Sequence, residues 1–76
     1  MKNYRVFEID NMRARLKGHI SCRLDETEKV TFKKLREIGF NINRKMFKLV
    51  WWDDDYAEIV NKFTDKSIGM VEVIYA

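Results

Sequence analysis

The chain has no proline, three glycines and a single cysteine among its 76 residues. Without proline or any Ser/Gly-rich or repetitive stretch, the sequence shows neither a linker nor a low-complexity segment. The lone Cys22 excludes an internal disulfide, so no covalent cross-link stabilises the fold, and a reducing cytoplasm is the expected location. We therefore expect one compact cytoplasmic domain over residues 1–76.

Long apolar runs are also missing, and the start MKNYRVFEID lacks the apolar core of a signal peptide. We therefore expect neither secretion nor contact with a membrane. The chain has no excess of acidic residues either, because its net charge is +3. A mimic of nucleic acid must be strongly acidic, so this class of protein is excluded.

The charges that are present are unevenly distributed. Residues 1–48 hold 13 Lys and Arg against 6 Asp and Glu, whereas residues 49–76 hold 2 against 6. A basic half of this kind favours polyanions or acidic protein surfaces as partners. The hydrophobic content of 46% is that of a folded chain rather than a disordered one.

The clearest pattern is an alternation with period two between Met12 and Leu24. The even positions are apolar or small, and the odd positions are polar: Arg13, Arg15, Lys17, His19, Ser21 and Arg23. A helix would need apolar residues near positions 15, 19 and 23, so the pattern favours a strand that is buried on one face. Its wet face would carry a column of cations spaced by about 6.5 to 7 Å.

Strand and helix signals surround this segment. Tyr4 to Ile9 alternates and predicts a first strand, which turns at Asp10-Asn11 to form a hairpin with the cationic strand. Asp25 and Glu28 match an N-terminal capping box, and Gly39 suits a C-terminal cap. The buried stripe expected of this helix is Val30, Leu35 and Ile38, with Phe32 or Thr31 at its margin.

The second half predicts another hairpin, a helix and a last strand. Phe40 and Ile42, a turn at residues 43–45 and the run from Phe47 to Trp52 indicate the hairpin. Asp53, Asp54 and Asp55 would open a second helix, whose apolar face is Tyr56, Ile59, Val60 and Phe63. Ile68 to Tyr75 would close the chain as a strand.

The resulting order, ββαββαβ, predicts an α+β domain with a mainly antiparallel sheet of four or five strands and two helices on one face. A ferredoxin-like variant is one alternative. A tight hairpin between the first two strands conflicts with that arrangement, so a different strand order stays open.

The cationic column suggests a nucleic-acid interface. Arg13, Arg15, Lys17, His19 and Arg23 suit phosphate contacts, which add affinity without sequence preference. Three residues of the second hairpin, Arg44, Lys45 and Lys48, would extend the column. The alternative is a solvated sheet face whose charges protect an edge from aggregation.

Two aromatic residues add to this picture. Trp51 and Trp52 must point to opposite sides of one strand, so one belongs to the core and the other lies on or near the open face. The exposed ring would stack on a base or anchor a protein partner, unless it packs on lysine stems or on the first strand.

Catalytic and metal sites are not expected. Asp53, Asp54 and Asp55 are consecutive and do not all aim at one ion, so helix capping explains them. His19 has no partner at a suggestive spacing, and Cys22 is expected to be buried and inert. We predict no enzyme activity, no cofactor and no metal.

The segment KKLREIGFNINRKMFKLVWW resembles a pattern in small phage-borne and plasmid-borne accessory domains. In that pattern a leucine-rich helix ends in Gly-Phe and is followed by an aromatic-Asn turn, a Lys and a Trp. The matching residues are Leu35, Gly39, Phe40, Asn43, Lys48 and Trp51, and Ile42 replaces the aromatic residue. The resemblance implies an origin in a mobile element.

The sequence thus predicts a small non-enzymatic binding protein that contacts nucleic acid, single-stranded or through the backbone, with its cationic sheet face. The alternative is a phage or mobile-element module that binds an acidic surface of a host protein and modulates it. A homodimer formed through an exposed strand edge is a third alternative.

Overall fold

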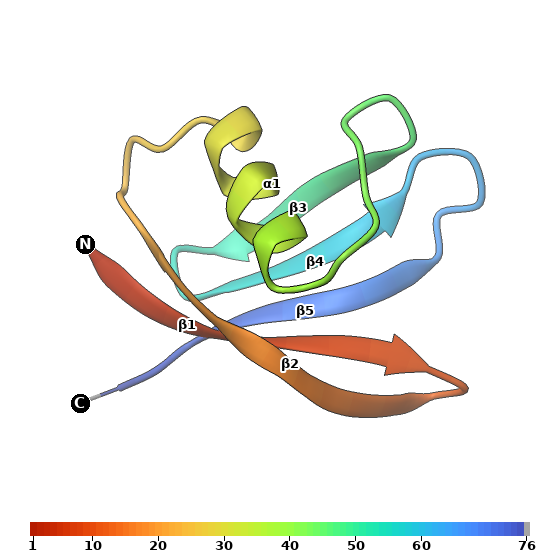
Figure 1. The fold of residues 1–76 in the computed structure, drawn as a ribbon, viewed down its shortest axis with the longest axis horizontal. Coiled ribbons are helices and arrows are strands. Elements are labelled where there is room, and N and C mark those ends of the chain that lie inside the picture. The colour runs from red at the N-terminus through yellow and green to blue at the C-terminus, as the bar shows by residue number, and fades with distance from the viewer. Residues whose placement is uncertain (76) are drawn as a thin grey trace.

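A computed structural model describes residues 1–75, which form a five-stranded antiparallel sheet and a single helix. The helix lies over one face of the twisted sheet (Figure 1), called the helix side below, and the opposite face is called the open side. The strand order is β2-β1-β5-β4-β3. The elements are β1 (Lys2–Asp10), β2 (Arg13–Cys22), α1 (Glu28–Glu37), β3 (Phe47–Asp53), β4 (Tyr56–Asn61) and β5 (Ser67–Val73).

The prediction of two helices in the order ββαββαβ is wrong, because residues 56–61 form strand β4. The acidic run does not start a helix but makes the tight turn between β3 and β4, where the Asp53 carboxylate accepts a hydrogen bond from the Asp55 N–H at 2.7 Å. Such side-chain bonds favour turns as readily as helix starts. A ferredoxin-like arrangement is excluded with the second helix.

The segment after α1 also differs from the prediction. Phe40 and Ile42 belong to a loop rather than a short strand, although both side chains are buried. The hairpin that contains Phe47 to Trp52 is instead the β3–β4 pair. The burial of these two loop residues, not strand pairing, explains the apolar alternation there.

Helix α1 begins later than the predicted capping box. Its N-cap is Thr27 instead of Asp25, and the Thr27 hydroxyl accepts a hydrogen bond from the Val30 N–H at 3.4 Å. Val30 is exposed, and the buried helical residues are Thr31, Phe32 and Leu35. The predicted cap at Gly39 is confirmed, since this residue has a φ of 109° directly after the helix.

The predicted hairpin of β1 and β2 is present, but a β-bulge interrupts it. Val6 pairs with Gly18, whereas Phe7 pairs with Leu16, so Lys17 is an extra residue in β2. Paired residues share a face of the sheet, and successive residues alternate between faces. The bulge therefore shifts the alternation of β2 by one residue between its two halves.

This shift divides the predicted cationic column. Arg15 pairs with Glu8, on the side of β1 that carries the buried Val6, whereas His19 pairs with Arg5 on the opposite side. Cations before and after the bulge consequently lie on different faces. The expectation of one continuous column on one face is wrong.

The hydrophobic core fills the space between α1 and the helix side of the sheet. Gly18 lets the helix approach β2, because a Cβ there would lie 3.2 Å from the Cβ of Ile38. The buried cluster includes Tyr4, Val6, Ile20, Cys22, Phe32, Leu35, Phe40, Ile42, Ala57, Ile59, Val71 and Val73.

Candidate functional site

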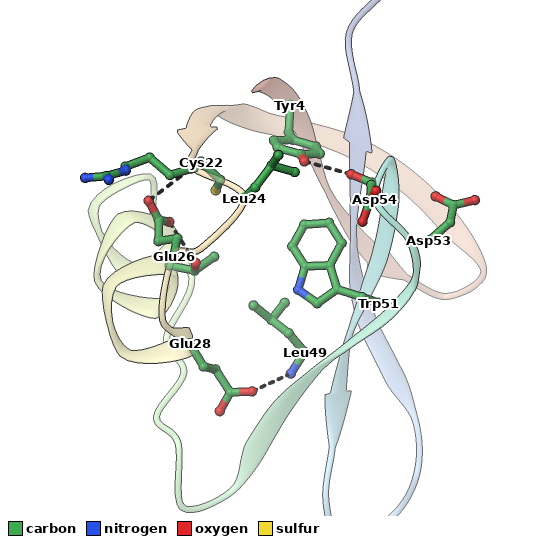
Figure 2. A pocket seen from close by; sticks show the side chains of 11 residues that line it. Tyr4, Cys22, Leu24, Glu26, Glu28, Leu49, Trp51, Asp53 and Asp54 are labelled. Atoms are coloured by element: carbon green, nitrogen blue, oxygen red, sulfur yellow. Dashed lines mark hydrogen bonds between the residues drawn. The ribbon is translucent and has the colours of Figure 1, made fainter. Parts of the chain in front are cut away.

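A pocket of about 500 Å³ opens on the helix side, between α1, the loop that precedes it and β3. The strand β3 is an edge of the sheet, so the pocket lies at the rim of the molecule. Figure 2 shows Trp51 reaching from β3 toward the loop, with Leu24 on the far side of the space. The residues that matter below are Tyr4, Leu24, Glu28, Leu49, Trp51 and Asp54.

Trp51 is the principal aromatic surface of the pocket. Its ring packs edge-on against Tyr4, with 5.6 Å between ring centroids and 66° between planes. Tyr4 is buried, and its hydroxyl donates to the backbone oxygen of Asp54 at 2.9 Å. Trp51 remains 42% exposed, and within residues 1–75 its indole N–H has no hydrogen-bond acceptor. Trp51 therefore presents to solvent a large aromatic ring that is fixed in place by Tyr4, together with an indole N–H that has no acceptor among these residues.

Carboxylates lie at opposite ends of this pocket. Glu28 accepts a hydrogen bond from the Leu49 N–H of β3 at 3.4 Å and lies 3.6 Å from the Nε of Arg44. Asp54 lines the opposite end of the pocket and is exposed. The neighbouring Asp53 pairs with Tyr56, whereas Trp51 pairs with Ala57, so the Asp53 side chain lies on the opposite face of the sheet from the Trp51 ring. Both contacts of Glu28 are long, so its charge is only partly compensated.

The Glu26 carboxylate also lines the pocket, but it is engaged in contacts that hold the fold together. Burial alone would raise the pKa of its carboxyl group, yet hydrogen bonds from Lys34, Thr31, Cys22 and the backbone of Arg23 together lower that pKa. Its side chain is 6% exposed. Glu26 therefore stays ionised and joins α1 to the preceding loop instead of facing a ligand.

Cys22 also lines the pocket without being a reactive group. Burial, followed by the neighbouring Glu26 carboxylate, raises the pKa of the thiol to about 11. A thiol with this pKa is protonated at neutral pH and is a poor nucleophile. The prediction that Cys22 is buried is confirmed.

Of the predicted cations, several are paired with carboxylates. The Nζ of Lys17 lies 3.6 Å from Glu8, and the Nε of Arg23 lies 3.3 Å from Asp25. Arg44 contacts Glu28 at the pocket, as described above. These ion pairs reduce the net positive field along β2 and at the loop after α1.

The remaining predicted cations do not converge on one surface. Arg13 and Arg15 are exposed at the far end of the β1–β2 hairpin and make no ion pair within residues 1–75. His19 is exposed on the open side. Lys45 lies in the loop before β3, and Lys48 lies within that strand at the other edge of the sheet.

Neither tryptophan belongs to the core, contrary to the prediction that one of them does. Trp52 is 67% exposed, and its indole N–H donates to the Glu58 carboxylate at 2.9 Å. Glu58 pairs with Val50, which directly precedes Trp51 in β3. Glu58 and the Trp51 ring therefore lie on opposite faces of the sheet. The two rings therefore lie on different faces of the sheet, and only Trp51 lines the pocket.

Sequence reasoning missed Tyr4, Leu24, Glu28, Leu49 and Asp54 as pocket residues. Leu24 was assigned to the buried face of the cationic strand, but it lies beyond β2 and is 79% exposed. The available signal was a Trp-Trp pair followed by three Asp residues. This stretch combines aromatic with acidic side chains. Only the fold shows that it lies opposite the start of α1.

Within residues 1–75, no group of three His, Cys, Asp or Glu side chains is placed to hold a metal ion. No helix in this part of the chain is both long and apolar enough to cross a membrane.

Comparisons with protein-family models, with curated proteins and with solved structures give no match to this chain. They therefore add no support to the resemblance to phage and plasmid domains.

Proposed function

We propose that this protein is a non-enzymatic interaction module that binds a partner protein at the pocket between α1 and β3. The observation that carries the proposal is Trp51, a half-exposed ring held by Tyr4 at the mouth of a concave surface. Tryptophan is enriched among the residues that dominate binding energy at protein interfaces. If the chain has the mobile-element origin suggested by its sequence, the partner is a host protein.

Leu24 and the edge position of β3 support this proposal. Leu24 is an exposed apolar side chain opposite Trp51, so a partner that fills the pocket would remove both from water. Because β3 lies at the edge of the sheet, a partner reaches the pocket without passing another strand. The site is thus accessible and partly apolar.

The test is affinity capture from a nuclease-treated lysate of the cells in which the protein occurs. We expect at least one protein to bind the unaltered chain and the Trp52→Ala variant, and to be lost with Trp51→Ala and with Leu24→Gln. Leu24 is exposed, so its substitution leaves the core intact. Equal capture by all four proteins would overturn the pocket as the binding site.

Binding to a nucleic-acid backbone is a second candidate function. It is favoured by Arg13 and Arg15, which are exposed and make no ion pair within residues 1–75, and by the net charge of +3. Backbone contacts of this kind are strongest at low salt. Lys17 and Arg23 would contribute to this binding only after their ion pairs with Glu8 and Asp25 are broken.

Fluorescence anisotropy with single-stranded and duplex oligonucleotides at low salt tests this candidate. The double variant Arg13→Gln, Arg15→Gln should weaken binding several-fold and reduce its salt dependence. The matched control removes two exposed helical charges, Lys29→Gln with Lys33→Gln. Absence of binding, or equal loss in both double variants, would exclude a specific role for the β1–β2 hairpin.

A further inference from the structure

The charged residues around Trp51 indicate which chemical class of ligand the pocket binds. Glu28 and Asp54 place carboxylates on its lining, the Glu26 carboxylate is engaged by Lys34, and Arg23 is the cation that lines it with them. Arg23 is itself paired with Asp25, at 3.3 Å. The pocket is therefore the acidic part of a chain whose net charge is +3.

Cationic groups are attracted to the face of an indole ring as well as to carboxylates. Both attractions are available at this pocket, because Asp54, in the turn that follows β3, lines it together with Trp51. Glu28 lines the pocket from the first turn of α1, on the other side of Leu49 from the ring (Figure 2). A cation that contacts the ring would thus lie within a negative field.

We propose that the pocket binds an arginine side chain presented by the partner protein, an inference that rests on the proposed function. A guanidinium group is planar, stacks on an aromatic face and donates hydrogen bonds to carboxylates along its edge. The Trp51 face supplies the stacking surface, and Glu28 or Asp54 supplies the acceptor. The free indole N–H of Trp51 is available to a backbone carbonyl of the same partner segment.

The aromatic content of the pocket argues against a methylated ammonium group. Quaternary ammonium ligands are held by cages of several exposed aromatic rings. Here Tyr4 is 3% exposed and supports Trp51 instead of facing the cavity. One accessible ring with carboxylates beside it fits a flat, hydrogen-bonding cation better than a spherical one.

The experiment uses the full chain labelled with ¹⁵N and three blocked pentapeptides, Gly-Gly-X-Gly-Gly, at millimolar concentration. X is arginine, citrulline or trimethyllysine. Citrulline has nearly the shape of arginine without its charge. We expect the arginine peptide to shift the amide signals of Leu24 and Leu49 and the indole signal of Trp51, with at least five-fold higher affinity than the other two peptides.

Charge variants localise the effect. Asp54→Asn and Glu28→Gln should each weaken binding of the arginine peptide by two-fold or more, whereas Asp65→Asn, an equal change of charge in the β4–β5 turn, should leave it unaltered. Asp54 and Asp65 are exposed, so both Asn variants should fold, and the control spectrum verifies this.

The outcomes separate the two levels of the proposal. Equal binding of the arginine and citrulline peptides at the pocket overturns the cationic ligand but leaves a peptide-binding pocket. Stronger binding of the trimethyllysine peptide would show that the pocket prefers another cation to guanidinium, and it would overturn the inference. If no peptide shifts these signals, the inference is overturned, while the lysate experiment decides separately whether the pocket binds a protein.

Discussion

Gly69 is the residue at which three parts of the chain approach most closely. A Cβ at this position would lie 2.9 Å from the Cδ1 of Ile59, 3.0 Å from the Cε1 of Phe40 and 3.0 Å from the backbone oxygen of Phe7. These atoms belong to β4, to the loop after α1 and to β1. The absence of a side chain at Gly69 therefore allows β5 to lie centrally in the sheet beneath that loop.

Gly69→Ala should lower the free energy of unfolding by about 1 to 3 kcal/mol, because the added methyl group meets backbone as well as side chains. Gly18→Ala is the matched control. Its nearest contacts are side-chain atoms of Ile38, at 3.2 and 3.3 Å, which move more easily than backbone. Urea denaturation measures both, and an equal loss in the two variants would contradict this account.

The thiol of Cys22 should react slowly with Ellman's reagent at pH 8. Its raised pKa of about 11 leaves almost no thiolate at that pH, and the side chain is buried. In urea the same thiol should react as fast as free cysteine. Rapid reaction of the folded protein would contradict the buried position and remove the argument against a nucleophilic role.

At the scale of elements, the start of α1 depends on more than its N-cap. Glu26 accepts hydrogen bonds from the Thr31 hydroxyl, at 2.8 Å, and from the Lys34 ammonium group. Lys34 also donates to the backbone oxygen of Ser21 at the end of β2. These contacts hold the helix to the end of β2, where Cys22 lines the pocket. A capping box between Asp25 and Glu28 does not form.

Glu26→Gln should be less stable than the unaltered chain by about 1 to 3 kcal/mol at pH 7. The pKa of Glu26 is lower in the folded than in the unfolded state, so its ionised form stabilises the fold above the ordinary carboxyl pKa of 4.5. That stability is lost as the pH falls through the folded pKa. The difference between the two proteins should therefore shrink on acidification, as measured by urea denaturation across pH, and Glu37→Gln is an exposed control.

The elements differ in how far the sequence predicts them. The β1–β2 hairpin follows from strict alternation, because each half keeps its own register on either side of the bulge. The segment 56–61 misled the prediction, because Tyr56, Ile59 and Val60 fit a helical stripe as well as a strand. Its true pairing, with β3 and β5, depends on contacts distant in the sequence. The bulge at Lys17 leaves no comparable mark in the pattern.

The candidate site was less predictable than the fold for a related reason. The Trp-Trp and Asp residues are visible in the sequence, but Leu24 and Glu28 join the pocket only because α1 begins beside β3, where Glu28 accepts a hydrogen bond from the Leu49 N–H. The cations, in contrast, were individually visible. Their pairing with Glu8 and Asp25 required the register of β2 and the conformation of the following loop.

At the scale of the whole molecule, one pairing links the two halves of the sheet. Neighbouring strands β1 and β2 are consecutive in the chain, as are β3, β4 and β5, but β1 pairs with β5, joining Tyr4 to Val73. The start of β1 and the end of β5 consequently lie at the same end of the molecule (Figure 1). Long-range pairing of this kind slows folding.

A circular permutant should fold faster than the unaltered chain. A short glycine-rich linker would join residues 1 and 76, and new ends would be opened between Arg44 and Lys45, which are exposed. The strand order then becomes a continuous meander from β3 to β2, followed by α1. We expect refolding to be roughly ten-fold faster in stopped-flow fluorescence, because loop closure for the β1–β5 pair becomes local.

A second circular permutant serves as the control, because it keeps one strand pairing that is distant in the sequence. A permutant with the same linker, opened within the β4–β5 turn near Asp65, makes the β4–β5 pairing distant instead. Its refolding rate should stay close to that of the unaltered chain. Equal acceleration in both permutants would show that the linker, rather than the order of strands, determines the rate.

The extra residue at position 17 has a consequence for how the chain can change over generations. The register of the hairpin already passes over Lys17, so its deletion would leave residues 13–16 opposite their present partners in β1 and on their present faces. The half of β2 that carries Ile20 and Cys22 would keep its partners as well, and the ion pair between Lys17 and Glu8 would be lost. A codon can thus be lost or gained at this position in descendants of this sequence while the same side chains keep facing the interior.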